Sequence, residues 1–285
     1  MAESWNWIMN QDNNQNFEIT IQKGLAALLL ILREYLEKQI ELKRIVRVAV
    51  LLIRAGVSIN NSVFQEIARH CLREQKDDGG WIGVEDSMWC VVFLKNFEGY
   101  FKEYKSGLDW LDEQWLKNGG WGKTNRDIGR ITTTGILLHL LPELSSEAGL
   151  RWLKNEWEKD LSCDIRLTYK GAFFLLGLKS SGISSHNCPL IKETYSFLEN
   201  EQNDDCGFGP WKDHPIGSDP WSTGIVLLGL LAYAELTTRN VIEKAVNWLT
   251  EKQLSDGLWP YHYIDEGSSY VYWGLIEALK YLKSQ

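Results

Sequence analysis

The sequence predicts an all-α toroid, in which about six helical hairpins build an inner ring and an outer ring of helices. Two observations carry this prediction. A short segment with Gln, Gly and Trp recurs at intervals of roughly 40–50 residues, the range of two-helix repeats, and its copies end at Trp81, Trp121, Trp211 and Trp259. Helical periodicity also dominates the chain, with helices of two kinds in alternation.

One kind of predicted helix is polar and amphipathic, like residues 240–253, and the other is almost wholly apolar, like residues 224–231. A helix that is apolar all round is buried on every side. The alternation therefore predicts polar outer helices and apolar inner helices. In chain order, the predicted helices span residues 17–38, 41–55, 60–75, 86–96, 106–117, 131–141, 146–158, 165–179, 189–202, 220–236, 238–253 and 269–283.

No Pro- or Ser-rich linker divides the chain, so we expect one toroid domain over residues 17–285. A polar arm, residues 1–16, precedes it and contains Trp5 and Trp7. The arm lacks a basic start and an apolar core, so it is not predicted to be a secretory signal. Residues 25–32 are apolar but too few to span a bilayer, and no transmembrane segment is predicted.

Composition excludes several classes of partner. The net charge of -8 argues against a nucleic-acid surface, which needs clustered Lys and Arg, and against electrostatic docking to anionic lipid. The five cysteines are odd in number and lack CxxC spacing. A disulfide framework is therefore not expected, and the chain is predicted to be cytoplasmic.

The last repeat gives the strongest motif. It reads Lys244-Ala245, three residues, Leu249, three residues, Gln253, three residues, and then Gly257-Leu258-Trp259. This is the QW motif, so the chain resembles squalene–hopene cyclases and the wider superfamily of terpenoid cyclases and protein prenyltransferase β-subunits, over roughly residues 60–283. The resemblance implies that Gln ties adjacent hairpins together. We expect Gly to allow the tight turn and Trp to cover the joint.

The predicted inner helices can be aligned on a small residue, at Thr134-Gly135, Lys170-Gly171, Thr223-Gly224 and Trp273-Gly274, with Cys90-Val91 as a divergent copy. Residues in the first turn of each helix should then surround one mouth of a central cavity. Four positions before the first residue of each pair stand Asp86, Arg130, Arg166, Asp219 and Ser269. Two positions before it stand Met88, Thr132, Thr168, Trp221 and Val271.

Class II terpenoid cyclases carry a DxDD motif whose middle Asp protonates the substrate. The best match here is Asp219-Pro220-Trp221-Ser222, which keeps only the first Asp. Those cyclases also usually build their site between two such domains. The resemblance leaves Asp219 and Asp86 as catalytic candidates, but Asp219 before Pro220 is equally typical of a helix N-cap.

Candidate substrate-binding residues share the same end of the barrel. Two neighbouring arginines can grip an anionic head group bidentately, and aromatic faces stabilise carbocations. The alternative is that the cations form ion pairs that only shape the mouth, and that the aromatic residues fill a core. The candidates are Arg130, Arg166, Lys170, Trp221, Tyr169, Thr132, Thr168, Trp89, Tyr270 and Trp273.

Other chemistries have weaker support. Asp204, Cys206 and His262 are of the types that hold zinc in protein prenyltransferases, but Asp204 and Cys206 precede the inner helix. No cofactor is predicted, and neither magnesium nor zinc has support. An α/α-barrel glycosidase would need two carboxylates about a sugar bond, and the mouth is rich in acids. They are Asp86, Asp127, Asp164, Asp219, Asp265 and Glu266.

The favoured hypothesis is therefore a terpenoid-cyclase-like protein that binds or cyclises an isoprenoid, either a prenyl diphosphate or a polyprene, in a central apolar cavity. The alternative is a non-catalytic toroid that binds a protein partner or a lipid.

Overall fold

The computed structural model describes residues 11–284, and this part of the chain is helical without strands. All twelve predicted helices are present, together with two short 3-10 turns. The helices are α1 (Gln11–Glu37), α2 (Leu42–Arg54), α3 (Ser62–Glu74), α4 (Val84–Leu94), α5 (Phe101–Glu113), α6 (Ile131–Leu140), α7 (Glu147–Leu161), α8 (Thr168–Ser180), α9 (Pro189–Asn200), α10 (Pro220–Ala232), α11 (Arg239–Glu251) and α12 (Ile264–Ser284).

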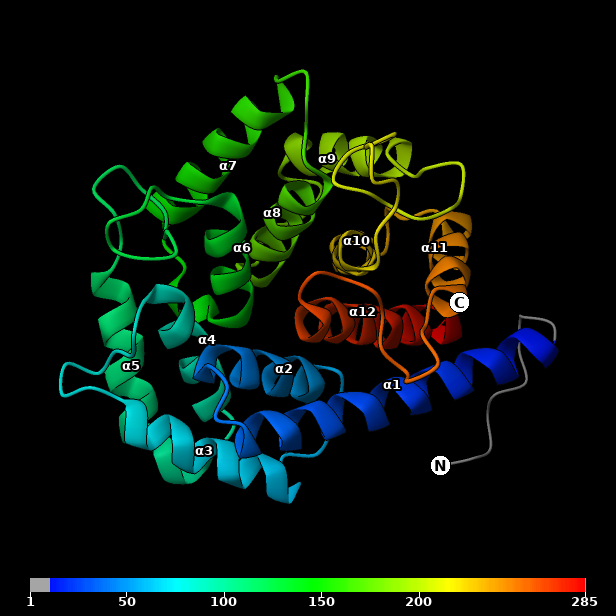
Figure 1. Cartoon of the computed structure of the whole chain (residues 1–285). Coiled ribbons are helices and arrows are strands. Elements are labelled where there is room, and N and C mark those ends of the chain that lie inside the picture. Colours follow the sequence, from blue (N-terminus) through cyan, green and yellow to red (C-terminus); the bar gives the residue numbers. More distant parts are fainter. Residues whose placement is uncertain (1–10, 285) are drawn as a thin grey trace.

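The helices form two concentric rings (Figure 1). The even-numbered helices surround the centre, and the odd-numbered helices lie around them. Successive inner helices pack against one another, and α12 packs against α2, so the last inner helix meets the first and closes the ring. The predicted all-α toroid is confirmed.

Burial explains which helix enters which ring. In α10, each residue from Ser222 to Leu230 is buried, whereas α11 buries only one stripe that includes Ile242, Ala245 and Leu249. An apolar helix loses contact with water on all sides only when neighbours surround it. The alternating composition of the sequence thus decides the two rings.

The Gln residues of the repeats connect neighbouring hairpins, as the resemblance implies. Gln253 Nε2 donates to the Gly257 carbonyl of its own turn, at 2.9 Å, and to the Thr20 carbonyl of α1, at 2.9 Å. Gln75 and Gln202 likewise bond their own turns and the next outer helix. Gln114 differs, because its amide donates to Trp110 within the same helix.

Tryptophan side chains cover three of the turns from an outer helix into the next inner helix, which are called joints below. The indole nitrogens of Trp81, Trp121 and Trp259 each donate to a carbonyl of the preceding outer helix, at 3.0, 2.8 and 2.7 Å. All three side chains are almost completely buried. The glycine at the turn has positive φ, for instance +91° at Gly257, which is a conformation that glycine adopts without a Cβ penalty.

The third repeat corrects the predicted alignment, because Phe208 and not Trp211 occupies the joint. The backbone amide of Phe208 donates to the Thr223 hydroxyl at 2.9 Å. Trp121 makes the equivalent bond to Thr134, also at 2.9 Å. Phe208 is fully buried, whereas Trp211 is partly exposed and lines the central cavity.

The same backbone bond sets the register of the inner helices. Trp81 donates to Ser87, and Trp259 donates to Ser268, both at 2.9 Å. Ser87, Thr134, Thr223 and Ser268 are therefore equivalent. The sequence alignment placed Cys90 in α4 and Trp273 in α12 at this position, which is wrong by three and five residues. Small residues recur within these helices, so the small residue used for the alignment was not unique.

A buried ion cluster joins α2 to α12 where the ring closes. Asp265, whose side chain is inaccessible to solvent, accepts from Arg44 at 2.5 and 3.2 Å and from Arg47 at 3.4 Å. Arg47 also pairs with Glu266 at 3.0 Å. Because a buried carboxylate is stable only when its charge is compensated, Asp265 depends on these arginines of α2, and the cluster ties α12 to α2.

Helix ends differ most from the prediction where polar residues extend a helix. α12 begins at Ile264 and α5 at Phe101, each five residues before the predicted start, and α1 begins at Gln11 within the predicted polar arm. A polar first turn adds backbone bonds to a helix that packing has already nucleated. Trp5 and Trp7 of the predicted arm lie outside the described residues.

Among the helices that the structure describes, none is long and apolar enough to cross a membrane.

Candidate functional site

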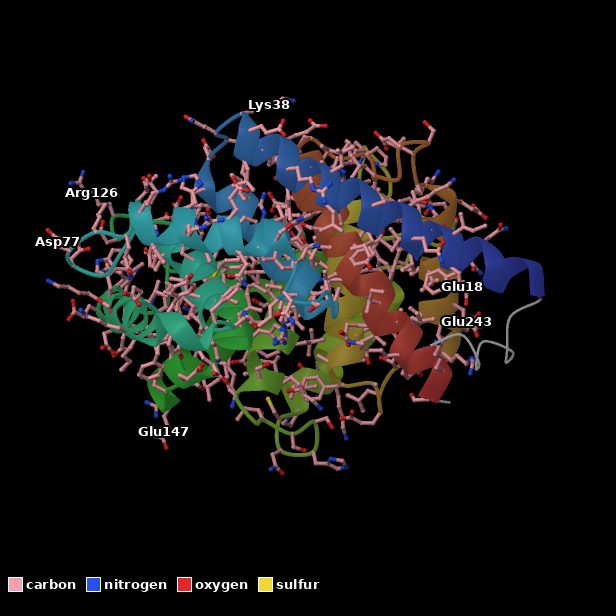
Figure 2. All side chains as sticks on the ribbon, turned by 90° about the horizontal axis from the view of Figure 1, so that it is seen from below. Glu18, Lys38, Asp77, Arg126, Glu147 and Glu243 are labelled. Carbon is pink, nitrogen blue, oxygen red and sulfur yellow. The ribbon has the colours of Figure 1, made fainter. Side chains whose placement is uncertain are left out.

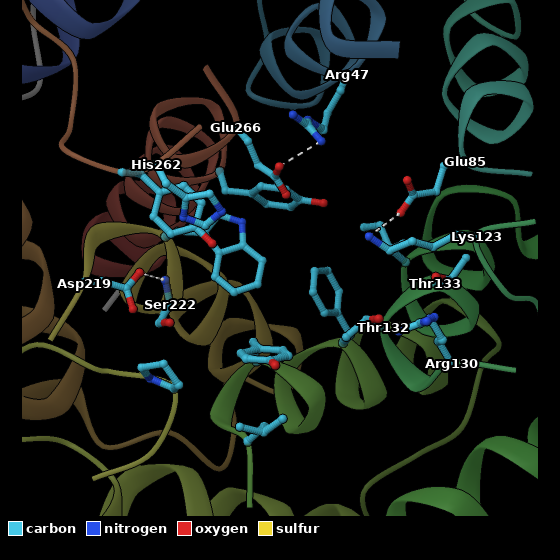
Figure 3. A pocket seen from close by; sticks show the side chains of 18 of the residues that line it. Arg47, Glu85, Lys123, Arg130, Thr132, Thr133, Asp219, Ser222, His262 and Glu266 are labelled. Carbon is cyan, nitrogen blue, oxygen red and sulfur yellow. Dashed lines mark hydrogen bonds and ion pairs between the residues drawn. The ribbon is translucent and has the colours of Figure 1, made fainter. Parts of the chain in front are cut away.

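A central cavity of about 550 Å³ opens at the end of the barrel where the inner helices begin. Its lining comes from the amino-terminal halves of the inner helices and from the connections that lead into them (Figure 3). The volume lies within the range of roughly 300–1,000 Å³ that is common for small-molecule sites.

Aromatic rings form one wall of this cavity around Trp221, from α10. The Trp221 ring lies 5.5 Å from that of Tyr261 and nearly parallel to it, at 9°. It is 5.1 Å from Tyr169 and 6.4 Å from Tyr270, both tilted or edge-on. Phe173 continues the wall, 6.1 Å from Tyr270. Burial raises the pKa of Tyr261 and Tyr270, so these hydroxyl groups stay neutral.

Asp219 lies at the edge of the aromatic wall and caps α10. Its carboxylate accepts from the Ser222 backbone amide at 2.8 Å, and Pro220 occupies the first helical position. The predicted N-cap is therefore present. Burial raises the pKa of Asp219, and hydrogen bonds from Ser222 and the charge of His214 only partly oppose this. Asp219 has no ion pair among the described residues, which distinguishes it from the other cavity acids.

The common register identifies a cavity-facing position in four inner helices, α4, α6, α10 and α12. Two residues before the equivalent Ser or Thr stand Glu85, Thr132, Trp221 and Glu266, and all four line the cavity. Glu85 was missed because the sequence alignment of α4 was shifted, and Glu266 was expected only among the acids of the mouth because the alignment of α12 was shifted. The usable signal was the first Ser that follows each joint tryptophan, Ser87 after Trp81 and Ser268 after Trp259.

Cations at the mouth are paired with carboxylates. Lys123 pairs with Glu85 at 3.7 Å, and Arg47 pairs with Glu266. Arg130 donates to Asp127 through two nitrogens, at 2.6 and 3.0 Å. These bonds lower the pKa of Asp127 and raise that of Arg130.

Arg47 is a further cavity residue that the sequence did not indicate. It comes from α2, where no small-residue marker was recognised, and it is only 8% exposed. Its Nε is buried without a hydrogen-bond partner, as is the indole nitrogen of Trp221. Figure 3 shows Arg47 and Glu266 on one side of the cavity and Lys123 with Glu85 on another.

Of the predicted site residues, the cavity brings together Asp219, Arg130, Thr132, Trp89, Tyr169, Trp221 and Tyr270. The others do not line it. Arg166 stacks on Phe197 at 5.0 Å, Lys170 pairs with Asp160 at 2.7 Å, and the Thr168 hydroxyl donates to the Gly209 carbonyl.

Asp86 and Trp273 lie at two other hollows. Asp86 lines a separate hollow between α1 and α3, and burial raises its pKa against the opposing charge of Lys43. Trp273 lies at the far end of the barrel beside His139, with Arg54 5.7 Å above its ring.

The described residues contain no group of three His, Cys, Asp or Glu side chains that is placed to hold a metal ion. Asp204, Cys206 and His262 therefore form no such group in this part of the chain.

Three kinds of chemical group line the cavity: aromatic rings, carboxyl groups and paired cations. Aromatic faces attract a positive charge, and a buried carboxyl group with a raised pKa retains a proton more readily than an exposed one. Paired cations hold carboxylates in place at the mouth. The cavity thus combines an aromatic wall, the half-buried carboxyl group of Asp219 and paired charges at its mouth.

Fold and comparisons agree on the class: the chain has a terpenoid-cyclase-like fold. No protein-family model matches the chain. Protostadienol synthase A from Arthroderma gypseum is 30% identical over 107 residues, which are 34% of this chain and 14% of that protein. Squalene–hopene cyclase from Zymomonas mobilis is 26% identical over 208 residues, 68% of this chain and 29% of that protein. The chain thus matches less than a third of the length of either relative.

Solved structures are similar over nearly their whole length. A protein from Actinoplanes has a TM-score of 0.73 at 13% identity, covering 92% of this chain and 99% of its own. The type II terpene cyclase MstE from Scytonema has a TM-score of 0.72 at 14% identity, covering 94% and 99%. A single-residue variant of MstE in complex with geranylgeranyl dihydroxybenzoate, its substrate, has a TM-score of 0.71 at 13% identity, covering 94% and 98%.

Proposed function

We propose that this protein binds an isoprenoid in the central cavity and cyclises it after protonation by Asp219. The observation that supports this proposal is a half-buried carboxyl group that forms no ion pair among the described residues, beside a cavity walled by aromatic rings. The proton would pass from Asp219 to a carbon–carbon double bond of the ligand. The resulting carbocation would be stabilised by the faces of Trp221, Tyr169 and Tyr270.

Ring closure would move the positive charge along the carbon chain. The final carbocation would lose a proton to form the product, and transfer of that proton to the Asp219 carboxylate would restore its neutral state. The overall reaction is an isomerisation, so the product has the mass of the substrate. Trp89 and Thr132 would contact the chain further round the wall, and Arg130 would lie at the mouth.

The comparison with MstE supports this proposal on one point. A structural match covers 98% of the chain that is described as holding geranylgeranyl dihydroxybenzoate. In that protein, a chain of matching extent accommodates an isoprenoid-bearing substrate.

The paired state of the mouth cations bears on the ligand's charge. Arg47, Lys123 and Arg130 each have a carboxylate partner. A diphosphate would have to displace these carboxylates, whereas an uncharged chain would not. We therefore propose that the part of the ligand inside the cavity is an uncharged polyprene chain. Arg166 and Lys170 are not proposed to bind a diphosphate.

The decisive experiment compares the wild type with Asp219→Asn. Asparagine is as good an N-cap as aspartate, so α10 should keep its start while the titratable proton is lost. Purified protein is incubated with squalene, geranylgeraniol and geranylgeranyl dihydroxybenzoate, and extracts are analysed by gas or liquid chromatography with mass spectrometry. We expect a product of unchanged mass and new retention time from the wild type only.

Asp109→Asn, on the outer helix α5 and outside the cavity lining, is the matched control and should retain activity. Cyclisation at the wild-type rate in Asp219→Asn would eliminate Asp219 as the acid. Absence of both binding and product in the wild type would end the proposal as a whole.

A second function is favoured by one observation, because Trp221 and Ser222 stand where class II cyclases carry the second and third acids of DxDD. We propose as the alternative a toroid that holds an isoprenoid without converting it. Retention of the ligand in native mass spectrometry with no new product would establish this alternative. Retention of neither ligand nor product would turn the search to protein partners.

Two further expectations remain proposals. We propose that residues 17–285 form a single folding unit, which limited proteolysis would test by giving one resistant core. We also propose a cytoplasmic location, supported by cysteines that are all free. Cell fractionation would test the location.

A further inference from the structure

A second hollow opens at the end of the barrel opposite the mouth of the central cavity. Side chains from α2, α6, α8, α10 and α12 line it, toward the ends of these inner helices, and its volume is about 330 Å³. Figure 2 shows Lys38 and Arg126 on the mouth side of the molecule and Glu147, at the start of α7, on the opposite side. Among the described residues, the central cavity and this far-end hollow share no lining side chain.

The far-end hollow combines apolar walls with an excess of positive charge. Its apolar side chains are Leu176, Leu228, Leu231, Ala232 and Trp273. Its charged side chains are Arg54, Lys179, Lys280 and Glu277. Glu277 pairs with Lys280 at 2.7 Å, whereas neither Arg54 nor Lys179 forms an ion pair in the part of the chain that the structure describes. The lysine and arginines of the central cavity differ, because each of them is paired with a carboxylate.

Neutral groups hold Arg54 in place. Its Nη2 lies 3.4 Å from His139 Nε2, and since a guanidinium can only donate, Nε2 is the acceptor. The imidazole proton therefore resides on Nδ1, which donates to the Ser180 hydroxyl at 2.7 Å. Burial and the charge of Arg54 lower the pKa of His139 to about 3, so the ring is neutral at physiological pH. The guanidinium also lies 5.7 Å from the centre of the Trp273 ring. None of these contacts supplies a negative charge.

Helix ends explain only part of this arrangement. Arg54 ends α2 and Lys179 lies in the last turn of α8, where a cation is favourable because the carboxyl end of a helix is partly negative. Helix dipoles do not require that the two cations line one hollow together with leucines. Arg54 remains open to solvent, yet burial lowers its pKa, and only the charge of Glu277 opposes this. An anion in the hollow would supply the missing compensation.

We propose that the far-end hollow binds a small organic oxyanion, which is a carboxylate or a phosphate ester with an apolar body. The oxyanion contacts Arg54 and Lys179, which donate charge-assisted hydrogen bonds to it. The apolar body contacts the leucines and the Trp273 ring. The volume lies near the lower limit of roughly 300–1,000 Å³ for small-molecule sites, so it suits a ligand with one ring or a short chain.

The test needs no isoprenoid, because the far-end hollow is separate from the central cavity. Isothermal titration calorimetry measures the Kd of purified full-length protein for benzoate, phenyl phosphate, inorganic phosphate and uncharged benzyl alcohol. We expect benzoate or phenyl phosphate to bind, and the tighter of the two identifies the oxyanion. Inorganic phosphate and benzyl alcohol should each bind at least about tenfold more weakly, because each lacks one half of the ligand.

Two variants, Arg54→Gln and Lys179→Gln, should each raise the Kd of the bound anion at least about tenfold, because each removes a charged donor. Lys179 is exposed, so its replacement should leave the melting temperature unchanged. Arg151→Gln is the matched control, since Arg151 is exposed on the outer helix α7 and lines neither cavity. It should bind the anion like the wild type.

The proposal would be overturned by a wild type that binds neither organic anion, or by equal affinities in the two variants and the control. Inorganic phosphate that binds as tightly as phenyl phosphate would contradict the apolar body of the ligand. Benzyl alcohol that binds as tightly as benzoate would contradict the role of the two cations.

Discussion

Replacement of Trp259 by alanine tests the idea that the joint tryptophans hold the hairpins together. Trp259 is completely buried, and its indole donates to the Leu249 carbonyl at 2.7 Å. Its ring also faces Gly24 of α1, where an added Cβ would lie 3.0 Å from it. One side chain therefore joins α11, α12 and the first outer helix at the point where the ring closes.

The expected loss follows from the buried area. A tryptophan removes roughly 150–250 Å² from water, worth about 4–6 kcal/mol at roughly 25 cal/mol per Å². Core truncations of this type cost about 3–5 kcal/mol when measured. Because the Leu249 carbonyl also loses its donor, we expect the free energy of unfolding to fall by about 4 kcal/mol.

Urea unfolding followed by near-ultraviolet circular dichroism would measure this loss, and Tm should fall by about 8–12 °C at roughly 2–3 °C per kcal/mol. Trp211→Ala is the matched control, since Trp211 belongs to the same sequence motif but lines the cavity and makes no indole hydrogen bond in the described structure. It should cost less than about 2 kcal/mol. Equal losses in the two variants would refute the assignment of the joint to Trp259.

Two further perturbations probe ring closure. Asp265→Asn should cost about 3–5 kcal/mol, because it leaves Arg47 buried with less compensation. Burial acts to raise the pKa of Asp265, but Arg44 and Arg47 outweigh it and lower that pKa. Its stabilisation is therefore present above about pH 4 and lost as pH falls further, and Asp265→Asn should flatten this acid dependence of urea unfolding. Gly257→Ala should cost more than Gly56→Ala in the same assay. Both have φ above +90°, but only at Gly257 would a Cβ meet a backbone oxygen, that of Lys23, at 2.6 Å.

The fold could be predicted because its determinants are local. The QW copies fix where an outer helix ends and an inner helix begins, and an apolar run such as residues 224–231 has no exposed face to place on the outside. Periodicity and turn chemistry act within about ten residues, so a single chain displays them directly.

The cavity was harder to predict because register is a long-range property. A shift of three residues in α4 places Asp86 at the mouth and conceals Glu85, and a shift of five in α12 keeps Glu266 from being recognised as the equivalent position. Arg47 depends on which turn of α2 faces the cavity, which is set by Asp265 more than two hundred residues away. Ion pairing of Arg130 was an open alternative in the sequence, and only the geometry gives its partner, Asp127.

The direction of the inner helices is enough to explain why acidic residues gather at the mouth. All the inner helices begin at this end, and their first turns concentrate the positive ends of several helix dipoles there. Carboxylates such as Glu85, Asp265 and Glu266 are stabilised in that field, and their number says little about catalysis. Each of these three has a cation within 4 Å, so each negative charge is already compensated by an ion pair. Asp219 occupies the same field without such a partner, yet burial raises its pKa. Asp219 thus differs chemically from the other mouth acids because no neighbouring cation stabilises its ionised form. A lysine introduced beside it would favour the carboxylate, and we expect it to abolish turnover while leaving the cap of α10 intact.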